Sequence, residues 1–321
     1  MLRVGMVGTG FISEWHYNAF LENPDAKITG ICANARKERA EALAKDWGIK
    51  AYADFDEMVT SSDIDAVVIG SRNPDHFSQI MKAMENGKHV LAEKPVVTDI
   101  AEIDVIAEAA KKNNVVLFPG HNFVYREAVQ IAKKMLDNGD IGKLMYASFS
   151  SAHTISAEHS VGWRANMALS NGGALMDSGH HQTYMSLYFL GAPSKVVALK
   201  SNLLYTEREV EDTVAVTLLY PNNLIANITQ TYTTDFSDSI NGVKLIGDKG
   251  SLIVTDALYF NDEKLNTDAD YADSFRGQAK AFSDCILHGK APLSDLADVR
   301  NTLRIIYGAY ESCESGKVYE L

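Results

Sequence analysis

The sequence predicts a parallel α/β domain followed by an α+β domain with a mostly antiparallel, open sheet. Two observations carry this prediction. Apolar segments typical of buried strands alternate with helical segments through the first 120 residues, and beyond Gly120 a helix leads into a run of strand signals. A chain of 321 residues is also longer than one hydrophobic core usually sustains. We therefore expect two domains, 1–120 and 121–321.

The composition argues against several classes of protein. Thirty basic and 42 acidic residues give a net charge of −12, which opposes extended contact with nucleic acid. No run of eighteen apolar residues is long enough to cross a membrane, and residues 1–7 resemble a strand rather than a secretory signal. Cys32, Cys285 and Cys313 lie far apart without metal-ligand spacing, which is typical of a reducing compartment. We expect a cytoplasmic protein.

A glycine-rich turn follows the first strand, at residues 2–7, and opens a helix that runs toward Pro24. In Gly8-Thr9-Gly10-Phe11-Ile12-Ser13, the first glycine permits a tight turn, the second lets a pyrophosphate approach the backbone, and the small serine allows close helix packing. A second strand follows at residues 28–32. This order predicts a Rossmann-type dinucleotide site; the alternative is a purely structural turn. The candidate contacts are Gly8, Thr9, Gly10, Phe11 and Ile12.

The segment after the second strand should contact the adenosine ribose. Residues 33–37 contain no acid, whereas Asn34 with Arg36 or Lys37 could accommodate a 2′-phosphate. The sequence therefore favours NADP over NAD. Alternatively, the basic residues are only the solvated start of the next helix.

The rest of the first domain continues the alternation. Strands are expected at 65–70 and 115–119, with helices from Asn73-Pro74 and from Thr98 or Asp99. Between them, residues 89–96 form a buried strand that ends in Glu93-Lys94-Pro95. Because ligands bind at the carboxyl ends of such strands, Lys94 is expected to point into a site. The alternative is an ordinary solvated lysine that follows a strand. A cis Lys94-Pro95 bond is a further hypothesis.

The second domain should combine a sheet with flanking helices. Its predicted helices span 123–138, 174–190, 272–288 and 295–315, and its predicted strands span 143–152, 195–203, 212–220, 224–232, 242–246 and 251–255. Asn222-Asn223 is the expected hairpin turn between two of these strands.

One segment of the second domain is dense in reactive side chains. If the chain around Asp177 is helical, Asp177 and His181 share a face, so the carboxylate would orient the imidazole; His180 is also a candidate. An oriented histidine could take a hydroxyl proton as hydride leaves the same carbon. The alternative is an ordinary Asp–His pair on a helix surface. No metal site is expected, because the zinc-binding HExxH pattern and cysteine pairs are missing.

Together these motifs resemble the Gfo/Idh/MocA family of nicotinamide-dependent oxidoreductases along essentially the whole chain. Beside the glycine turn and Glu93-Lys94-Pro95, the matching segments are 73–76, 87–92, Trp163-Arg164, 172–177 with His181, 243–252 and 310–317. The resemblance implies a substrate cleft and acid/base roles for Lys94, Asp177 and His181. It extends the candidate cofactor contacts to Ser71, Asn73, His76, Glu93 and Lys94. It also implies a homodimer or homotetramer that associates through the C-terminal sheet.

Two departures from the family pattern bear on specificity. Ser71-Arg72 stands where the family often has threonine-proline, and Tyr184 stands where it often has an acid. Tyr184 therefore puts inositol-type or simple sugar specificity in doubt. The candidates for shaping the substrate pocket are Arg72, Tyr125, Arg126, His153, Trp163, Arg164 and Tyr184.

The predicted function is an NAD(P)-dependent dehydrogenase or reductase that acts on a secondary alcohol or carbonyl of a sugar, polyol or related small molecule. Two alternatives remain. One is a glycoside hydrolase that retains its cofactor and oxidises its substrate transiently. The other is a non-catalytic, cofactor-binding sensor on the same fold.

Overall fold

The computed structural model describes residues 1–235, 240–267 and 270–321. The chain forms two compact units, of which the first contains Met1–Tyr125 with Tyr271–Leu296 and the second contains Arg126–Asp270 with Ala297–Leu321. Residues 271–296, which include the helix predicted at 272–288, belong to the first of these units. In the described part of the chain, no helix is both long and apolar enough to span a membrane.

The first unit is a parallel sheet flanked by helices. Among described residues the sheet has six strands in the order β3-β2-β1-β4-β5-β6, all parallel. This is the order of a Rossmann fold. Its elements are β1 (Leu2–Val7), α1 (Phe11–Leu21), β2 (Ala26–Cys32), α2 (Lys37–Trp47), β3 (Lys50–Ala51), α3 (Phe55–Thr60), β4 (Ala66–Ile69), α4 (Asn73–Glu85), β5 (His89–Glu93), α5 (Ile100–Lys112), β6 (Leu117–Gly120), η1 (Asn122–Tyr125) and α9 (Tyr271–His288).

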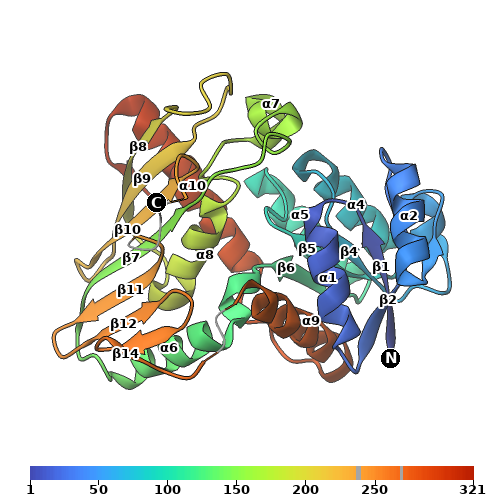
Figure 1. Ribbon diagram of the computed structural model, residues 1–321, viewed down its shortest axis with the longest axis horizontal. Helices are drawn as coiled ribbons and strands as arrows, with labels where there is room; N and C mark the ends of the chain where they lie inside the picture. Colours follow the sequence, from blue (N-terminus) through green and yellow to red (C-terminus); the bar gives the residue numbers. More distant parts are fainter. Residues whose placement is uncertain (236–239, 268–269) are drawn as a thin grey trace. The chain divides into compact units, whose positions relative to one another are not determined.

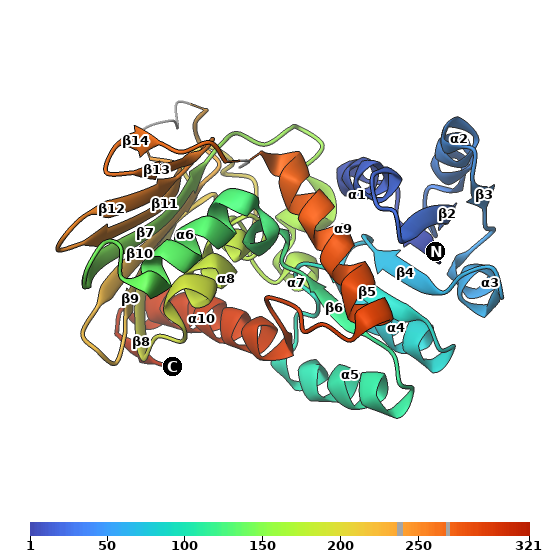
Figure 2. The ribbon, with the colours of Figure 1, turned by 90° about the horizontal axis from the view of Figure 1, so that it is seen from below.

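The core of this unit lies on both faces of the sheet, as the unbroken apolar strands predict. All four residues of β4 are removed from solvent. Helix α5 begins after Asp99, whose Oδ1 accepts a hydrogen bond from Ala101 N at 2.8 Å, so Asp99 rather than Thr98 is the cap. Helix α9 returns from the far end of the sequence to pack against α1 and η1 (Figure 2).

The second unit is a mixed sheet with helices on one face (Figure 1). Nine described strands follow the order β14-β13-β12-β11-β7-β10-β9-β8-β15. The elements are α6 (Glu127–Asn138), β7 (Leu144–Ala152), η2 (Gly162–Ala165), α7 (Met167–Ser170), α8 (Gly179–Leu190), β8 (Lys195–Ser201), β9 (Thr213–Leu219), β10 (Ile225–Thr231), β11 (Gly242–Gly247), β12 (Ser251–Val254), β13 (Leu258–Phe260), β14 (Glu263–Lys264), α10 (Leu296–Ser315) and β15 (Tyr319–Glu320).

The pairing in this sheet confirms a mostly antiparallel arrangement with one exception. Strands β7 and β10 are parallel neighbours, with Ala147 beside Ala226 and Ala152 beside Thr231. Strands β9 and β10 form the expected hairpin: Asn223 has φ +65° and its N–H donates to Tyr220 O at 2.9 Å. The predicted helix at 174–190 is shorter than expected, because residues 174–178 form turns and α8 starts only at Gly179.

Candidate functional site

The glycine-rich turn leaves open space at the start of α1. Gly8 has φ +106°, and a Cβ there would lie 2.5 Å from Gly70 O, so only glycine fits. A Cβ at Gly10 would meet no protein atom within 4 Å. Ser13 is fully buried and its hydroxyl donates to Gly8 O at 3.0 Å. The first amides of α1 therefore face an open approach, which suits a pyrophosphate.

The remaining predicted contacts near this turn differ in exposure. Phe11 is 70% exposed at the first position of α1, whereas Thr9 is 4% exposed. Asn34 and Arg36 are exposed after β2, and Arg36 occupies the position that precedes α2. This exposed polar segment without a carboxylate is compatible with a 2′-phosphate. The arrangement of residues fits the adenosine half of a dinucleotide.

Lys94 lies half-buried at the end of β5, next to a buried contact between a histidine and a glutamate. Glu93 Oε1 is 2.7 Å from His16 Nε2 on α1, and both side chains are almost completely removed from solvent. Glu93 Oε2 accepts a hydrogen bond from the Lys94 backbone N–H at 3.2 Å. The Lys94-Pro95 bond is cis, as hypothesised. The carboxylate of Glu93 thus fixes the backbone that carries Lys94.

His76 holds the chain on the other side of Lys94. Its Nδ1 lies 2.8 Å from Pro95 O and its Nε2 lies 3.3 Å from Ser71 O. Burial lowers the pKa of His76, so the ring is neutral at neutral pH and donates one of these bonds. Ser71 Oγ also donates to Gln79 Oε1 at 2.6 Å. His76 and Ser71 therefore have structural contacts, whereas their predicted contacts with a cofactor stay predictions.

His121 follows β6, and burial together with the positive charge of Lys94 lowers its pKa. Its Nδ1 is 2.7 Å from Ser294 Oγ, and the ring is fully buried. Burial, with the nearby positive charge of Lys94, lowers the pKa of His121 to about 3. Sequence reasoning missed His121 because a lone histidine after a strand carries no spacing signal.

In the second unit, Glu211 shapes the turn that leads to Asp177. Its carboxylate accepts hydrogen bonds from Gly173 N at 3.0 Å, from Leu175 N at 2.9 Å and from the Tyr310 hydroxyl at 2.9 Å. Glu211 is 5% exposed. Burial and the adjoining carboxylate raise the pKa of Tyr310, so its phenol remains a donor. This buried carboxylate positions residues 173–175, the segment just before Asp177.

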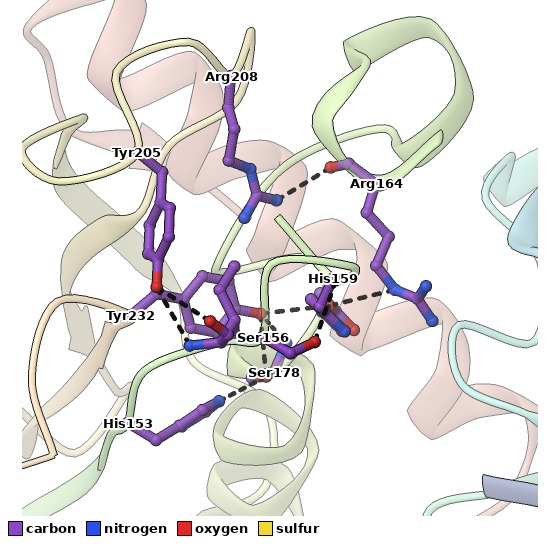
Figure 3. Close-up of polar contacts among 10 residues, drawn as sticks. His153, Ser156, His159, Arg164, Ser178, Tyr205, Arg208 and Tyr232 are labelled. Carbon is purple, nitrogen blue, oxygen red and sulfur yellow. Dashed lines mark hydrogen bonds and ion pairs between the residues drawn. The ribbon is translucent and has the colours of Figure 1, made fainter. Parts of the chain in front are cut away.

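Asp177 contacts a histidine that the sequence reasoning did not pair with it. Asp177 Oδ2 lies 2.6 Å from His159 Nε2, 3.3 Å from the Tyr232 hydroxyl that donates to it, and 3.9 Å from Arg164 Nε. The expected pairing with His181 assumed a helix through both residues. Asp177 lies in a turn that precedes α8, so no continuous helix runs through both residues, and their pairing stays a prediction. Tyr232 also donates to Ser178 Oγ at 2.9 Å (Figure 3).

His181 contacts Tyr184 one turn further along α8. His181 Nδ1 lies 2.7 Å from the Tyr184 hydroxyl, and Tyr184 is 1% exposed. His181 is half-buried, whereas its neighbour His180 is fully buried. The tyrosine that departs from the family pattern therefore has a defined contact, which is with the predicted acid/base histidine.

Arg164 lies between an aromatic ring and a second arginine. Its guanidinium carbon is 4.3 Å from the centroid of the Trp163 ring, and its carbonyl oxygen accepts a hydrogen bond from Arg208 Nη2 at 3.0 Å (Figure 3). Arg208 is 6% exposed. His153 Nε2 is 3.5 Å from Ser178 Oγ in the same group (Figure 3). The second unit thus gathers Trp163, Arg164 and Asp177 from segments apart in the sequence.

Three other pocket candidates have contacts of their own. Arg72, which is exposed, forms a two-bonded pair with Asp75, with Nε–Oδ2 at 3.0 Å and Nη2–Oδ1 at 3.2 Å. Tyr125 is buried in the first unit and its hydroxyl accepts from Leu293 N at 3.1 Å. Arg126 opens the second unit and precedes α6. Their part in substrate binding stays a prediction.

A cavity of about 340 Å³ lies elsewhere in the first unit, near the amino end of β2. It is lined by Tyr17, Phe20, Leu21, Lys27, Ile28, Thr29, Trp47, Gly48, Ile49 and Lys50. None of the predicted site residues lines it. Among the described residues, no group of three or more His, Cys, Asp or Glu side chains is placed to hold a metal ion.

The two units match the two domain models of one family. Residues 2–121 match the oxidoreductase family with an NAD-binding Rossmann fold, and residues 129–253 match the GFO/IDH/MocA C-terminal domain. A relative, myo-inositol 2-dehydrogenase of Thermotoga maritima, is 25% identical over 100% of this chain and 98% of its own length. The scyllo-inositol 2-dehydrogenase (NADP(+)) of Bacillus subtilis is 31% identical, but the alignment spans 62% of this chain and 61% of that relative.

Solved structures share the fold. A levoglucosan dehydrogenase in complex with NADH and levoglucosan superimposes with a TM-score of 0.87 at 22% identity, covering 99% of each chain. The open glycine turn, the strand order of the first sheet and the two matching domain models agree. The chain is a member of the Gfo/Idh/MocA family of NAD-binding oxidoreductases.

Proposed function

We propose that the protein is an NAD(P)-dependent dehydrogenase or reductase that transfers hydride between a nicotinamide and a secondary alcohol or carbonyl of a sugar, polyol or related small molecule. The observation that carries this proposal is the anchoring of Lys94 at the end of β5, with Glu93 bonded to its backbone N–H and His16 bonded to Glu93. A lysine fixed at the carboxyl edge of a dinucleotide-binding sheet is suited to proton exchange with a bound hydroxyl. Relatives named for inositols support the substrate class.

We assign acid/base roles to Lys94, Asp177 and His181. Lys94 is half-buried, Asp177 bears a charge near Arg164, and His181 is hydrogen-bonded to Tyr184. Lys94 and His181 each offer a nitrogen atom that can accept a proton, and Asp177 offers a carboxylate. When bound, the nicotinamide supplies or accepts the hydride.

The test is a panel of sugars and polyols with each nicotinamide, followed by absorbance of the reduced form. Lys94→Ala should abolish turnover while the affinity for the reduced cofactor, measured by fluorescence, stays within about threefold of the unaltered protein. Lys112→Ala, at the end of α5, is the matched control and should keep full activity. Unchanged turnover in Lys94→Ala would refute the assignment. Glycoside cleavage without net absorbance change would support the cofactor-retaining hydrolase, and tight cofactor binding without turnover would support the sensor.

We further propose that NADP is preferred over NAD. Asn34 and Arg36 are exposed where the adenosine ribose binds in this fold, and a carboxylate there would repel a 2′-phosphate. Asn34→Asp should therefore weaken NADPH binding by at least about tenfold and leave NADH binding unchanged or improved. Dissociation constants measured for both cofactors decide this. Tighter binding of NADH by the unaltered protein would contradict the proposal.

We also propose that the second sheet mediates a homodimer or homotetramer. Helices α6 and α8 pack on one face of this sheet, while its other face bears exposed apolar side chains at Val197, Leu199 and Ile225. Such a row of exposed apolar residues is typical of an interface. Leu199→Glu should shift the molar mass measured by light scattering toward the monomer. A monomeric unaltered protein would refute this proposal.

A further inference from the structure

His159 is held by a carboxylate through one ring nitrogen and exposes the other. Its Nε2 lies 2.6 Å from Asp177 Oδ2. The His159 side chain is 30% exposed, and its Nδ1 is not buried. Within the described part of the chain, Nδ1 has no hydrogen-bond partner. A neutral imidazole that donates from Nε2 carries its lone pair on Nδ1. The Asp177 contact therefore leaves His159 with an accessible proton acceptor.

The carboxylate that holds His159 is itself fixed. The Tyr232 hydroxyl donates to Asp177 Oδ2 at 3.3 Å, and the Tyr232 ring lies edge-on to His159 with centroids 6.3 Å apart. The turn before Asp177 is held by Glu211 through two backbone N–H groups. A base whose orientation is set by a third group is the arrangement that general-base catalysis requires.

The two histidines close to the predicted acid/base group therefore have different contacts. His159 Nε2 lies against the Asp177 carboxylate, which holds the ring in one orientation. His181 Nδ1 lies 2.7 Å from the Tyr184 hydroxyl. The spacing in the sequence pointed to His181, whereas the hydrogen bond to Asp177 comes from a loop residue 18 positions earlier.

We propose that His159 is an acid/base residue of the hydride-transfer reaction, with Nδ1 as its working atom and Asp177 as the group that orients it. The inference rests on the proposed function. In the direction of oxidation, the substrate O–H bond breaks and its proton forms an N–H bond at His159 Nδ1. The hydride from the same carbon reduces the oxidised nicotinamide, and the C–O bond becomes a carbonyl. Because Nδ1 is exposed, the proton then passes to solvent.

The first test does not depend on activity. Long-range nitrogen–proton NMR spectra of protein labelled at histidine, with the His159 signals assigned by their loss in His159→Gln, report which ring nitrogen bears the proton. The unaltered protein should show His159 protonated on Nε2 and unprotonated on Nδ1 at pH 8, and Asp177→Asn should remove that preference. A ring protonated on Nδ1 would overturn the proposal.

The second test separates a catalytic role from a structural one. His159→Ala should lower kcat by roughly 10²–10⁴-fold with little change in the KM of the cofactor, and added imidazole should restore at least about tenfold of the lost rate. His288→Ala, an exposed histidine at the end of α9, is the control and should respond to neither change. His159→Gln, whose folding is checked by circular dichroism, replaces the alanine variant if that variant does not fold.

The outcomes distinguish this inference from the proposed function. If the unaltered protein oxidises a sugar or polyol and His159→Ala keeps its kcat within about threefold, the role of His159 is refuted and the dehydrogenase assignment stands. A loss of kcat that imidazole does not restore likewise refutes the role of His159. If the unaltered protein shows no nicotinamide-coupled turnover with any substrate, both proposals fall together.

Discussion

His16 Nε2 on α1 lies 2.7 Å from Glu93 Oε1 at the end of β5, and the two side chains are 2% and 10% exposed. This contact joins the helix that follows the glycine turn to the strand that carries Lys94. Among the described residues, this is the one buried side-chain hydrogen bond between α1 and β5.

Removing one partner of this pair should destabilise the protein. His16→Leu leaves the Glu93 carboxylate buried without its partner, so the free energy of unfolding should fall by roughly 3–5 kcal/mol. Urea unfolding followed by circular dichroism measures it. Lys133→Ala breaks the more exposed Lys133–Asp137 pair and should change the same quantity by less than about 1 kcal/mol. Equal changes in the free energy of unfolding in the two variants would contradict the prediction that the buried pair contributes more to stability.

The Glu211 carboxylate should be more important for stability than the phenol that donates to it. Glu211→Gln replaces one carboxylate oxygen, which accepts a hydrogen bond from the backbone of residues 173–175, by an amide NH2 group that cannot accept one. The free energy of unfolding should therefore fall by about 2–4 kcal/mol. Tyr310→Phe removes one bond and should cost about 1–2 kcal/mol. Tyr319→Phe, at a half-exposed site, serves as the control. A larger loss of unfolding free energy in Tyr310→Phe than in Glu211→Gln would contradict this prediction.

Gly8 and Gly10 should respond differently to an added methyl group. Gly10→Ala meets no protein atom, so stability should change little while affinity for the cofactor falls by at least about tenfold, because the methyl occupies the approach of the pyrophosphate. Gly8→Ala must adopt φ +106° against Gly70 O and should lose roughly 1–3 kcal/mol of stability. Thermal unfolding and cofactor titration of both variants are compared. Full affinity in Gly10→Ala would place the pyrophosphate elsewhere.

His121 should make stability depend on pH in the acid range. Its pKa is about 3 in the folded protein and near 6.5 when unfolded, so the unfolded chain binds the additional proton as pH falls. The contribution is complete above pH 6.5 and is lost progressively toward pH 3, at about 1.4 kcal/mol per pH unit. His121→Gln should reduce the slope of unfolding free energy between pH 5.5 and 4.5 by that amount. Equal slopes in the variant and the unaltered protein would contradict the pKa of His121.

The sequence predicted the elements of the first unit well, because each signal involves residues that are close together in the chain. The turn at Gly8, the buried strand that ends at Glu93 and the cap at Asp99 each depend on residues a few positions apart, and each appears in the structure. The parallel sheet followed from the alternation of strand and helix, since parallel neighbours require crossover helices. The family, too, was evident from short motifs that are contiguous in the sequence.

Contacts between distant segments could not be read in this way. Helix α9 returns from residue 271 to pack on α1, and β7 pairs in parallel with β10, although neither event leaves a periodic mark in the sequence. Glu211 was missed because an acid before a strand looks solvated until its partners, the 173–175 amides and Tyr310, are known. The start of α8 at Gly179 depended on those same bonds.

The sequence by itself therefore determined the fold class and the glycine turn, and it named Lys94 and Asp177 as candidate acid/base residues. Only the tertiary structure decided that His159, from a loop with no periodicity, contacts Asp177. The physical reason is that periodicity reports which residues face the core, whereas a hydrogen bond between side chains depends on where two separate segments are brought together.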